Sequence, residues 1–340
     1  MLRILTIAFA TVLATVSPAF AQKAEVLKQQ KLGKWGVTPA NYSGITHISG
    51  NRYAVVSDKE EASGFRIFTI DIDTVTGKVL RVNADTLRGF HPHFPRDEEG
   101  ICYFPEDGTL FISGEADQIV MEYDTLGIPT GRQFDVPEMF SLKNIQPNMG
   151  FEALTYHSAG KRFYTMTEGA LPRDGGKASR ALRLAAFNDR LQCVAQYAYS
   201  MEAPTMKDGG RLHLQGVSAI TALPDGRIIV LEREVRIPSS YFGAKVRCRL
   251  FSVVPANEKF IKENTDIQSL PVSEFMKKTE IADFTTQLNI QHMNFANYEG
   301  MCLGPRLSDG RQTLLLIDDT QAGAGNGLFR LKEHIKVIVL

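Results

Sequence analysis

Five segments of the chain share two matching positions, of which the first is acidic in three segments and the second in all five. The spacing of these acids makes them the first candidates for chemistry. The first position opens an apolar run and precedes a small residue, as in E-G-I-C-Y from residue 99 and E-G-M-C-L from residue 299. The five first positions hold Ser43, Glu99, Glu152, Ser218 and Glu299. The second positions, 14 to 19 residues later, hold Asp58, Glu115, Glu168, Glu232 and Asp318.

Carboxylates brought together at one point repel one another and resist desolvation, and a divalent cation offsets both effects. Oxygen ligands without cysteine favour calcium or magnesium over zinc. We therefore expect a Ca²⁺ site, with these candidate ligands: Glu99, Glu115, Glu152, Glu232, Glu299 and Asp318. The alternative is structural, with the acids capping strand ends or pairing with Arg66, Arg173 and Arg233.

The same acids are the candidates for catalysis, since the familiar nucleophile and nucleotide motifs are missing. The sequence contains no G-x-S-x-G, no P-loop and no H-E-x-x-H. The candidate catalytic residues are Glu152, Glu168, Glu299 and Arg173. The candidate substrate-binding residues, from loops that enter the repeats, are His93, Arg96, Arg211 and His213. These histidines are alternatively ordinary loop residues.

The elements that must position these residues repeat in the same five segments. Each segment has a β-branched and aromatic-rich run, a glycine-containing turn and a second such run, usually followed by a third and a fourth. The segments start at residues 43, 99, 152, 218 and 299. Four antiparallel strands per period predict an all-β fold, a β-propeller with five blades. A strand from residues 22–42 is expected to close the ring. Residues 257–277 are expected as an insertion, and a degenerate blade there would make six.

The N-terminus has the pattern of a secretory signal peptide, residues 1–21. An apolar run follows Arg3, and Ala19 and Ala21 have the spacing of a cleavage site. We expect an exported protein, periplasmic or extracellular, with residues 22–340 as one propeller domain and no later transmembrane segment. Its 38 basic and 38 acidic residues balance, which does not suggest nucleic acid or an anionic membrane as partner. A closed propeller is expected to stand as a monomer that acts on a small-molecule substrate.

The four cysteines form no C-x-x-C pair, which excludes a zinc ribbon or a thioredoxin-like motif. Cys102 and Cys302 occupy the same place in two repeats and are expected to be buried strand residues. A Cys193–Cys248 bridge between outer strands is compatible with export, but the sequence does not fix the pairing.

The ordered motifs S-G-I, D-E-E-G-I, N-x-G-F-E-A-L, T-E-G-A-L-P-R-D-G, V-L-E-R-E and N-Y-E-G-M with I-D-D resemble the phytase-like family, described as having esterase-like activity of phytase. The resemblance covers about residues 40 to 330 and implies a secreted β-propeller. The family's motif residues fall here on Asp97, Glu99, Glu115, Asn148, Glu152, Glu168, Glu232, Glu234, Asn297, Glu299 and Asp318. Ala153 replaces a usual glycine, and Asp319-Thr320 stands where the family often has Asp-Asn.

Three functions remain open at this point. The leading hypothesis is an exported metal-dependent hydrolase that cleaves a phosphoester or a carboxylic ester, with Ca²⁺ polarising the substrate and activating water. The second is a lactone hydrolase on the same scaffold. The third is a propeller that binds a ligand or protein without catalysis.

Overall fold

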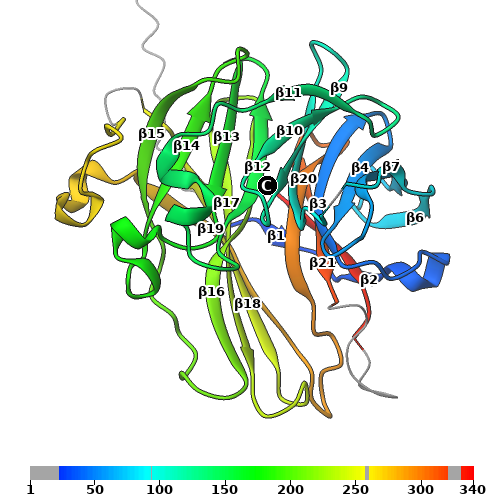
Figure 1. Cartoon of the computed structure of the whole chain (residues 1–340). Coiled ribbons are helices and arrows are strands. Elements are labelled where there is room, and N and C mark those ends of the chain that lie inside the picture. Colours follow the sequence, from blue (N-terminus) through cyan, green and yellow to red (C-terminus); the bar gives the residue numbers. More distant parts are fainter. Residues whose placement is uncertain (1–22, 93, 257–259, 321–330) are drawn as a thin grey trace, which may run out of the picture.

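The structure is a computed structural model that describes residues 23–92, 94–256, 260–320 and 331–340. The described residues form five antiparallel sheets and several 3-10 turns, with no α-helix among them (Figure 1). Each sheet is one blade of a propeller, so the five predicted repeats are confirmed as five blades. The predicted signal peptide, residues 1–21, and His93 lie outside the described residues.

The first two blades are built from residues 42–133. Blade 1 consists of β3 (Tyr42–Ser49), β4 (Arg52–Ser57), β5 (Ser63–Ile72) and β6 (Val79–Ala84), with β7 (Arg88–Phe90) also paired to β5. Blade 2 consists of β8 (Glu98–Phe104), β9 (Thr109–Gly114), β10 (Val120–Tyr123) and β11 (Pro129–Gln133).

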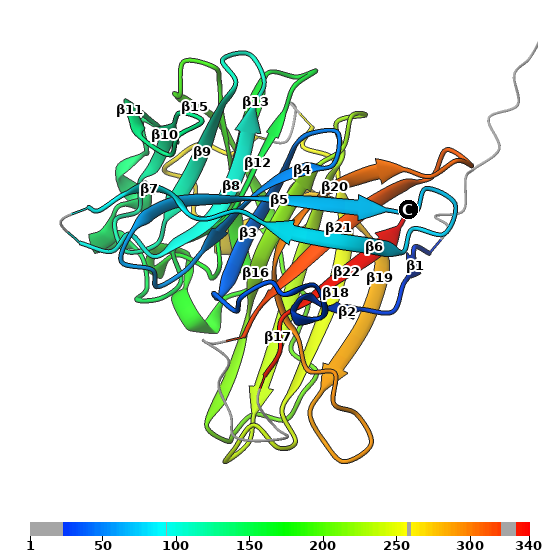
Figure 2. The same ribbon diagram turned by 90° about the vertical axis from the view of Figure 1, so that its right-hand side faces the viewer.

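The next two blades follow the same order. Blade 3 consists of β12 (Phe151–His157), β13 (Arg162–Thr167), β14 (Ala181–Phe187) and β15 (Cys193–Ser200). Blade 4 consists of β16 (Leu212–Ala222), β17 (Ile228–Ile237), β18 (Lys245–Val253) and β19 (Lys278–Gln287). Strands of blade 4 extend below the rest of the molecule in both views (Figures 1 and 2).

Blade 5 joins the two ends of the chain and confirms the predicted closure by an N-terminal strand. It consists of β20 (Asn297–Arg306), β21 (Gln312–Asp319), β22 (His334–Val339) and β1 (Glu25–Val26), with β2 (Gln30–Lys31) also paired to β22. The first strands of successive blades contact one another around the whole ring, from β3 through β8, β12, β16 and β20 back to β3.

Short 3-10 turns lie in the connections. They are η1 (Leu32–Trp35), η2 (Glu138–Phe140), η3 (Leu142–Asn144), η4 (Pro172–Asp174), η5 (Gly176–Ala178), η7 (Ile267–Ser269) and η8 (Val272–Glu274). The last two belong to the predicted insertion, of which residues 260–277 are described. Phe260 bridges to Tyr197 and the Met276 N–H donates to the Ala198 carbonyl, so this stretch lies along the outer strand of blade 3.

Hydrophobic side chains fill the space between blades. Five clusters of buried residues correspond to the five interfaces, for example Leu231 and Leu250 of blade 4 with Leu314 of blade 5. Alternate residues of each strand enter the two neighbouring interfaces, as expected for sheets packed face to face. Cys102 and Cys302 are buried as predicted, but all four cysteines are free, so the Cys193–Cys248 bridge is not formed.

Candidate functional site

The first strand of every blade carries a β-bulge at the same place. The pairing register shifts at the bulges that contain Ser43, Glu99, Glu152, Ser218 and Glu299. A bulge adds a residue to one strand and redirects its side chain. The repeated acids of the first position are therefore bulge residues. Glu99, Glu152 and Glu299, which we call the axial acids, face one central cavity.

The small residue after the bulge is explained by the close approach of neighbouring first strands. A Cβ added to Gly44 would lie 2.2 Å from the Glu99 carbonyl oxygen, and one added to Gly300 would lie 3.1 Å from the Cα of Gly44. A Cβ on Gly100 would lie 2.8 Å from the Cβ of Leu154. The E-G pattern thus combines an acid that faces the axis with a residue that lets the strands meet.

The end of each second strand supplies a further layer of polar side chains. In each blade, the end of the second strand pairs with the residue that lies two positions before the bulge residue. The second-strand residues at this place are Asp58, Glu115, Glu168, Arg233 and Asp319, which we call the second tier. All but Asp319 line the cavity. The sequence instead predicted Glu232 and Asp318 at this layer. Each lies one residue away, and a shift of one residue turns a strand side chain to the opposite face.

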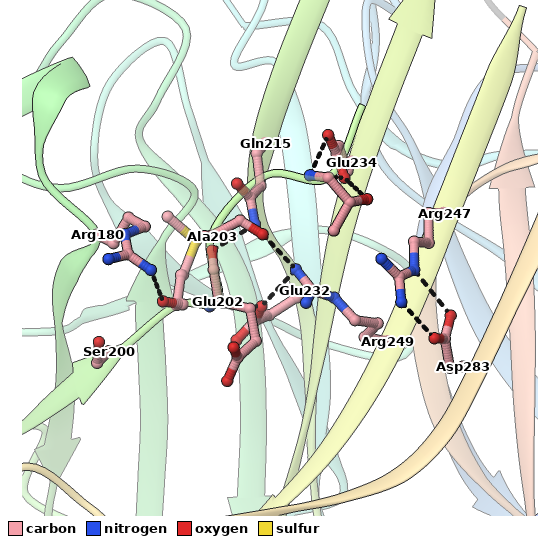
Figure 3. A network of polar contacts seen from close by, with 12 residues as sticks. Arg180, Ser200, Glu202, Ala203, Gln215, Glu232, Glu234, Arg247, Arg249 and Asp283 are labelled. Carbon is pink, nitrogen blue, oxygen red and sulfur yellow. Dashed lines mark hydrogen bonds and ion pairs between the residues drawn. The ribbon is translucent and has the colours of Figure 1, made fainter. Parts of the chain in front are cut away.

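Glu232 and Glu234 project from the other face of β17 and hold residues 202–206 (Figure 3). Glu232 accepts hydrogen bonds from Tyr199 Oη at 2.6 Å, Lys278 Nζ at 2.8 Å and the Glu202 N–H at 3.0 Å. Glu234 accepts hydrogen bonds from the backbone N–H groups of Thr205 and Met206. These carboxylates are therefore occupied outside the cavity.

Asp318 contacts the third strand of its own blade. Its Oδ1 accepts a hydrogen bond from the His334 N–H at 2.5 Å, and its Oδ2 lies 3.2 Å from the His334 Nδ1. Burial raises the pKa of Asp318 well above its usual value and lowers that of His334 to about 3. Asp318 is thus a buried residue of the blade interior, and it does not line the cavity.

The axial cavity has a volume of about 370 Å³ and an excess of acidic groups. Its lining includes six carboxyl groups, those of Asp58, Glu99, Glu115, Glu152, Glu168 and Glu299. Three cationic side chains, Lys59, Arg211 and Arg233, face them, together with Asn148 and Asn297. With all groups ionised, negative charges exceed positive charges by three.

Arg233 is the central cation of this arrangement. One guanidinium nitrogen donates to Glu299 and to Asn297 Oδ1 at 3.1 Å, and the other donates to Glu168 Oε1 at 2.5 Å. Glu168 Oε2 is buried without a hydrogen-bond partner among the described residues. Arg233 therefore compensates two carboxylates and Lys59 pairs with Asp58, whereas Glu99, Glu115 and Glu152 have no ion pair among the described residues.

The electrostatics of the cavity favour protonated or metal-bound carboxyl groups. Burial raises the pKa values of Glu99 and Glu152 well above the usual range, and neighbouring carboxylates raise them further. Burial also raises the pKa of Glu299, against the opposing effect of Arg233. For Asp58, burial and then Asp319 raise the pKa to about 6, although Lys59 opposes them.

One edge of the cavity brings three acids together. Carboxylate oxygens of Asp58, Asp97 and Glu99 lie within 4.8 Å of one another. Asp97 and the adjacent Lys59 have left-handed backbones, with φ of 55° and 54°, and the Lys59 N–H donates to Asp97 Oδ1 at 3.2 Å. Such conformations are uncommon outside glycine and concentrate at functional sites. Asp58 Oδ1 is buried without a hydrogen-bond partner in the described chain.

The basic residues and the histidine predicted to bind substrate or to act in catalysis lie in different parts of the structure, and the cavity lining contains Arg211 but not the others. Arg211 lines the cavity, and its guanidinium lies over the Tyr241 ring at 5.9 Å. His213 is the next residue but one and hydrogen-bonds to Glu234, on the polar face of blade 4. Arg96 is buried inside blade 2 against Asp117 and Tyr123. Arg173 is exposed in η4 and does not line the cavity.

Sequence reasoning omitted Lys59 from the site and considered Arg233 only as a partner for strand-end acids. Arg233 follows Ser218 by the same 15 residues that separate Asp58 from Ser43. That spacing was the available signal for Arg233. Lys59 gave none, because its place depends on the left-handed turn after β4.

A family model described as "Esterase-like activity of phytase" matches residues 39–321 of the chain. A search of curated proteins gave no match. Among the residues that the structure describes, we find no helix with the length and apolar character needed to cross a membrane.

Solved structures match most of this chain at low sequence identity. A PQQ-bound aldose sugar dehydrogenase from Streptomyces coelicolor is 12% identical over 94% of this chain and 99% of its own, with a TM-score of 0.47. An endo-arabinase from Bacteroides thetaiotaomicron is 9% identical over 91% of this chain and 96% of its own, with a TM-score of 0.46. Likenesses of this degree carry no functional argument.

Proposed function

We propose that this chain, which belongs to the phytase-like family, is an exported metal-dependent hydrolase of phosphoesters or carboxylic esters. The observation that carries the proposal is the excess of carboxyl groups in one cavity at the propeller axis. Carboxylates at this density are costly for stability alone, and their pKa values are shifted as in many active sites.

The cavity has the donor set for Ca²⁺. The grouped oxygens of Asp58, Asp97 and Glu99 would hold the ion, and Asp58 Oδ1 has no competing hydrogen bond in the described chain. An all-oxygen set is what Ca²⁺ prefers. Of the ligands expected from the sequence, Glu99 remains in this set, while Glu115, Glu152 and Glu299 line the same cavity.

When bound, the ion would supply a Lewis acid that polarises the ester group and lowers the pKa of water. Glu152 would transfer the proton, because its carboxyl faces the cavity, it makes no hydrogen bond to the described chain, and burial together with neighbouring carboxylates raises its pKa above the usual range. Arg233 would favour the ionised forms of Glu168 and Glu299 against the effect of burial and would hold both side chains in position. Arg211 lies at the cavity where it can contact bound substrate.

The test is hydrolysis of 4-nitrophenyl phosphate and 4-nitrophenyl acetate by the mature protein, with Ca²⁺ or with excess chelator. We expect turnover of at least one ester with Ca²⁺ and its loss in chelator. Glu152→Gln should lower kcat by about 100-fold or more, the usual contribution of a proton-transfer group. Glu138→Gln is the matched control, since that glutamate is exposed in η2 outside the cavity.

Other outcomes would select the alternatives. Full turnover in chelator would contradict the metal-dependent mechanism. Turnover of lactones without turnover of phosphoesters would favour the lactone hydrolase. Turnover of no ester, with Glu152→Gln and Glu299→Gln changing stability alone, would favour a propeller that only binds its ligand.

A further inference from the structure

Blade 4 extends past the acidic cavity, and the other blades do not. Strand β16 begins at Leu212, six residues before its bulge residue Ser218. The first strands of blades 1, 2 and 3 begin one residue before theirs, and that of blade 5 begins two before. The extension is visible below the rest of the ring (Figures 1 and 2). The cavity wall is therefore longer on the side of blade 4 than on the other sides.

The face of this extension that lines the cavity is apolar. Leu212 pairs across the strands with Ile237, and Leu214 pairs with Val235. These four residues alternate along β16 and β17 and line the cavity together with Tyr241 and Phe295. We call this set the apolar wall. Leu212 is 40% exposed, which is unusual for a leucine in a paired strand and leaves it accessible to a ligand.

The opposite face of the same strands is polar. His213 pairs with Arg236, and Gln215 pairs with Glu234. Gln215 and Glu234 bond to residues 202–206, as Figure 3 shows for that side of the blade. The polar face is therefore already occupied by the chain's own backbone. The apolar wall faces the cavity mainly through Leu212, Leu214 and Tyr241, with Val235, Ile237 and Phe295 largely buried behind them.

The wall begins close to the acids. A Cβ on Gly216 would lie 2.3 Å from Glu168 Cγ, so Gly216 marks the level of the second tier. At about 3.3 Å per residue, Leu214 lies about 7 Å and Leu212 about 13 Å farther along the strand. A ligand held at the acids can therefore lay an apolar group several carbons long on the wall.

The charge of the cavity limits what that ligand can be. The lining carries three more negative than positive groups when all are ionised. One divalent cation leaves the balance negative. Arg233 and Lys59 are already paired with acids of the site. Arg211 is then the one lining cation among the described residues without an acidic partner. A polyanion would therefore meet repulsion that no free cluster of cations offsets.

We infer that the substrate is an uncharged carboxylic ester, open or cyclic, with an apolar acyl group that lies on the wall formed by Leu212, Leu214, Val235, Ile237, Tyr241 and Phe295. This inference rests on the proposed hydrolase function and narrows it. A highly charged phosphate ester is excluded as the preferred substrate. In the reaction, the oxygen of water bonds to the carbonyl carbon and the ester C–O bond breaks. Glu152 accepts a proton from water and returns it to the departing alcohol.

The test compares 4-nitrophenyl acetate, butanoate and hexanoate with 4-nitrophenyl phosphate, using the Ca²⁺-supplemented protein. Burial of each methylene is worth up to about fourfold in binding. We expect kcat/KM to rise at least about tenfold from acetate to hexanoate, and to be lowest for the phosphate. The double variant Leu212→Ser, Leu214→Ser should abolish the rise. Leu126→Ser, at a residue 67% exposed in blade 2, should leave the rise intact.

A binding measurement separates this inference from the proposed function. Hexanoate and acetate, the acids that hydrolysis would release, are titrated into the same proteins by calorimetry. Tighter binding of hexanoate, lost in the double leucine variant, would support the wall even if no ester is hydrolysed. Ester turnover without dependence on acyl length would overturn the wall and leave the hydrolase standing. Preference for the phosphate, or neither turnover nor hexanoate binding, would overturn the inference.

Discussion

At the scale of single residues, Arg233 compensates the charge of the acids that surround it. It is buried and pairs with both Glu168 and Glu299, so its removal would leave two buried carboxylates without compensation. The same positions in blades 1, 2 and 3 hold Asp58, Glu115 and Glu168, so this arginine replaces an acid in the repeated pattern. Arg233 reduces the negative charge of the cavity, but it forms no ion pair with Asp58, Asp97 or Glu99.

We predict that Arg233→Met lowers the free energy of unfolding by about 3–5 kcal/mol at pH 7, the usual cost of breaking a buried ion pair. The loss should shrink toward pH 4.5, because Glu168 and Glu299 then become protonated and need no cation. Urea unfolding at both pH values measures it. Arg227→Met, at an arginine 49% exposed that pairs with the exposed Asp225, is the control. An equal loss at both pH values would contradict this role.

The pH dependence of the metal-free protein follows from the raised pKa values. A carboxyl whose pKa is higher in the folded state binds more protons folded than unfolded, so its contribution to stability is lost as pH rises. For Asp58, whose pKa is raised to about 6, the loss falls between its ordinary value and pH 6. Glu99 and Glu152 extend the loss to higher pH.

Thermal unfolding in chelator should therefore show a melting temperature that falls between pH 5 and pH 8. Saturating Ca²⁺ should remove most of this slope, because the ion replaces the protons. A melting temperature that rises over this range in chelator would contradict this, because it would mean that the cavity carboxyl groups are ionised in the folded protein without a bound cation.

At the scale of elements, the bulge and the glycine after it act together to place an acid at the axis between closely packed strands. The bulge turns the acid to the axis, and the glycine permits adjacent first strands to touch. A methyl group at Gly44 would overlap a backbone oxygen that has no freedom to move, since it belongs to the neighbouring bulge.

Gly44→Ala should therefore lower the free energy of unfolding by about 1–3 kcal/mol, as overpacking of a close contact does. Gly33→Ala is the matched control, because a Cβ there has no neighbour within 4 Å. Chemical unfolding of both variants tests the claim. Equal stability of the two variants would mean that the first strands do not approach as closely as described.

The blades could be predicted from the sequence, but the strand face on which each acidic side chain lies could not. Strand runs and turns repeat over every blade, so the five sheets and the closing strand could be predicted. The bulges could not, because one extra residue leaves the apolar pattern almost unchanged. The choice of Glu232 and Asp318 over Arg233 and Asp319 was wrong by that one residue. Asp97 joins the site through a left-handed backbone, which no periodicity reveals.

At the scale of the whole molecule, β1 connects the last blade to its neighbour. Glu25 and Val26 pair with Val339 and Ile338 of β22, and the Ala24 N–H donates to the Ile281 carbonyl of blade 4. The strand therefore covers the edge of β22, and an uncovered edge is a template for aggregation.

Deleting residues 22–28 from the mature protein should lower the free energy of unfolding by about 2 kcal/mol, since several backbone hydrogen bonds are lost. The melting temperature should fall by a few degrees, and light scattering should reveal concentration-dependent association. The point variant Lys28→Ala, at an exposed residue of the same segment, should do neither. An unchanged melting temperature for the deletion would mean that β1 does not close the ring.

The central claim is that the carboxyl groups at the propeller axis form a calcium site. The most direct test is calorimetric titration of Ca²⁺ into chelator-treated mature protein and into Glu99→Gln. We predict saturable binding near one ion per chain in the native protein, with release of protons, and at least about tenfold weaker binding in the variant. Absence of saturable binding to the native protein, or equal binding to both, would contradict the claim.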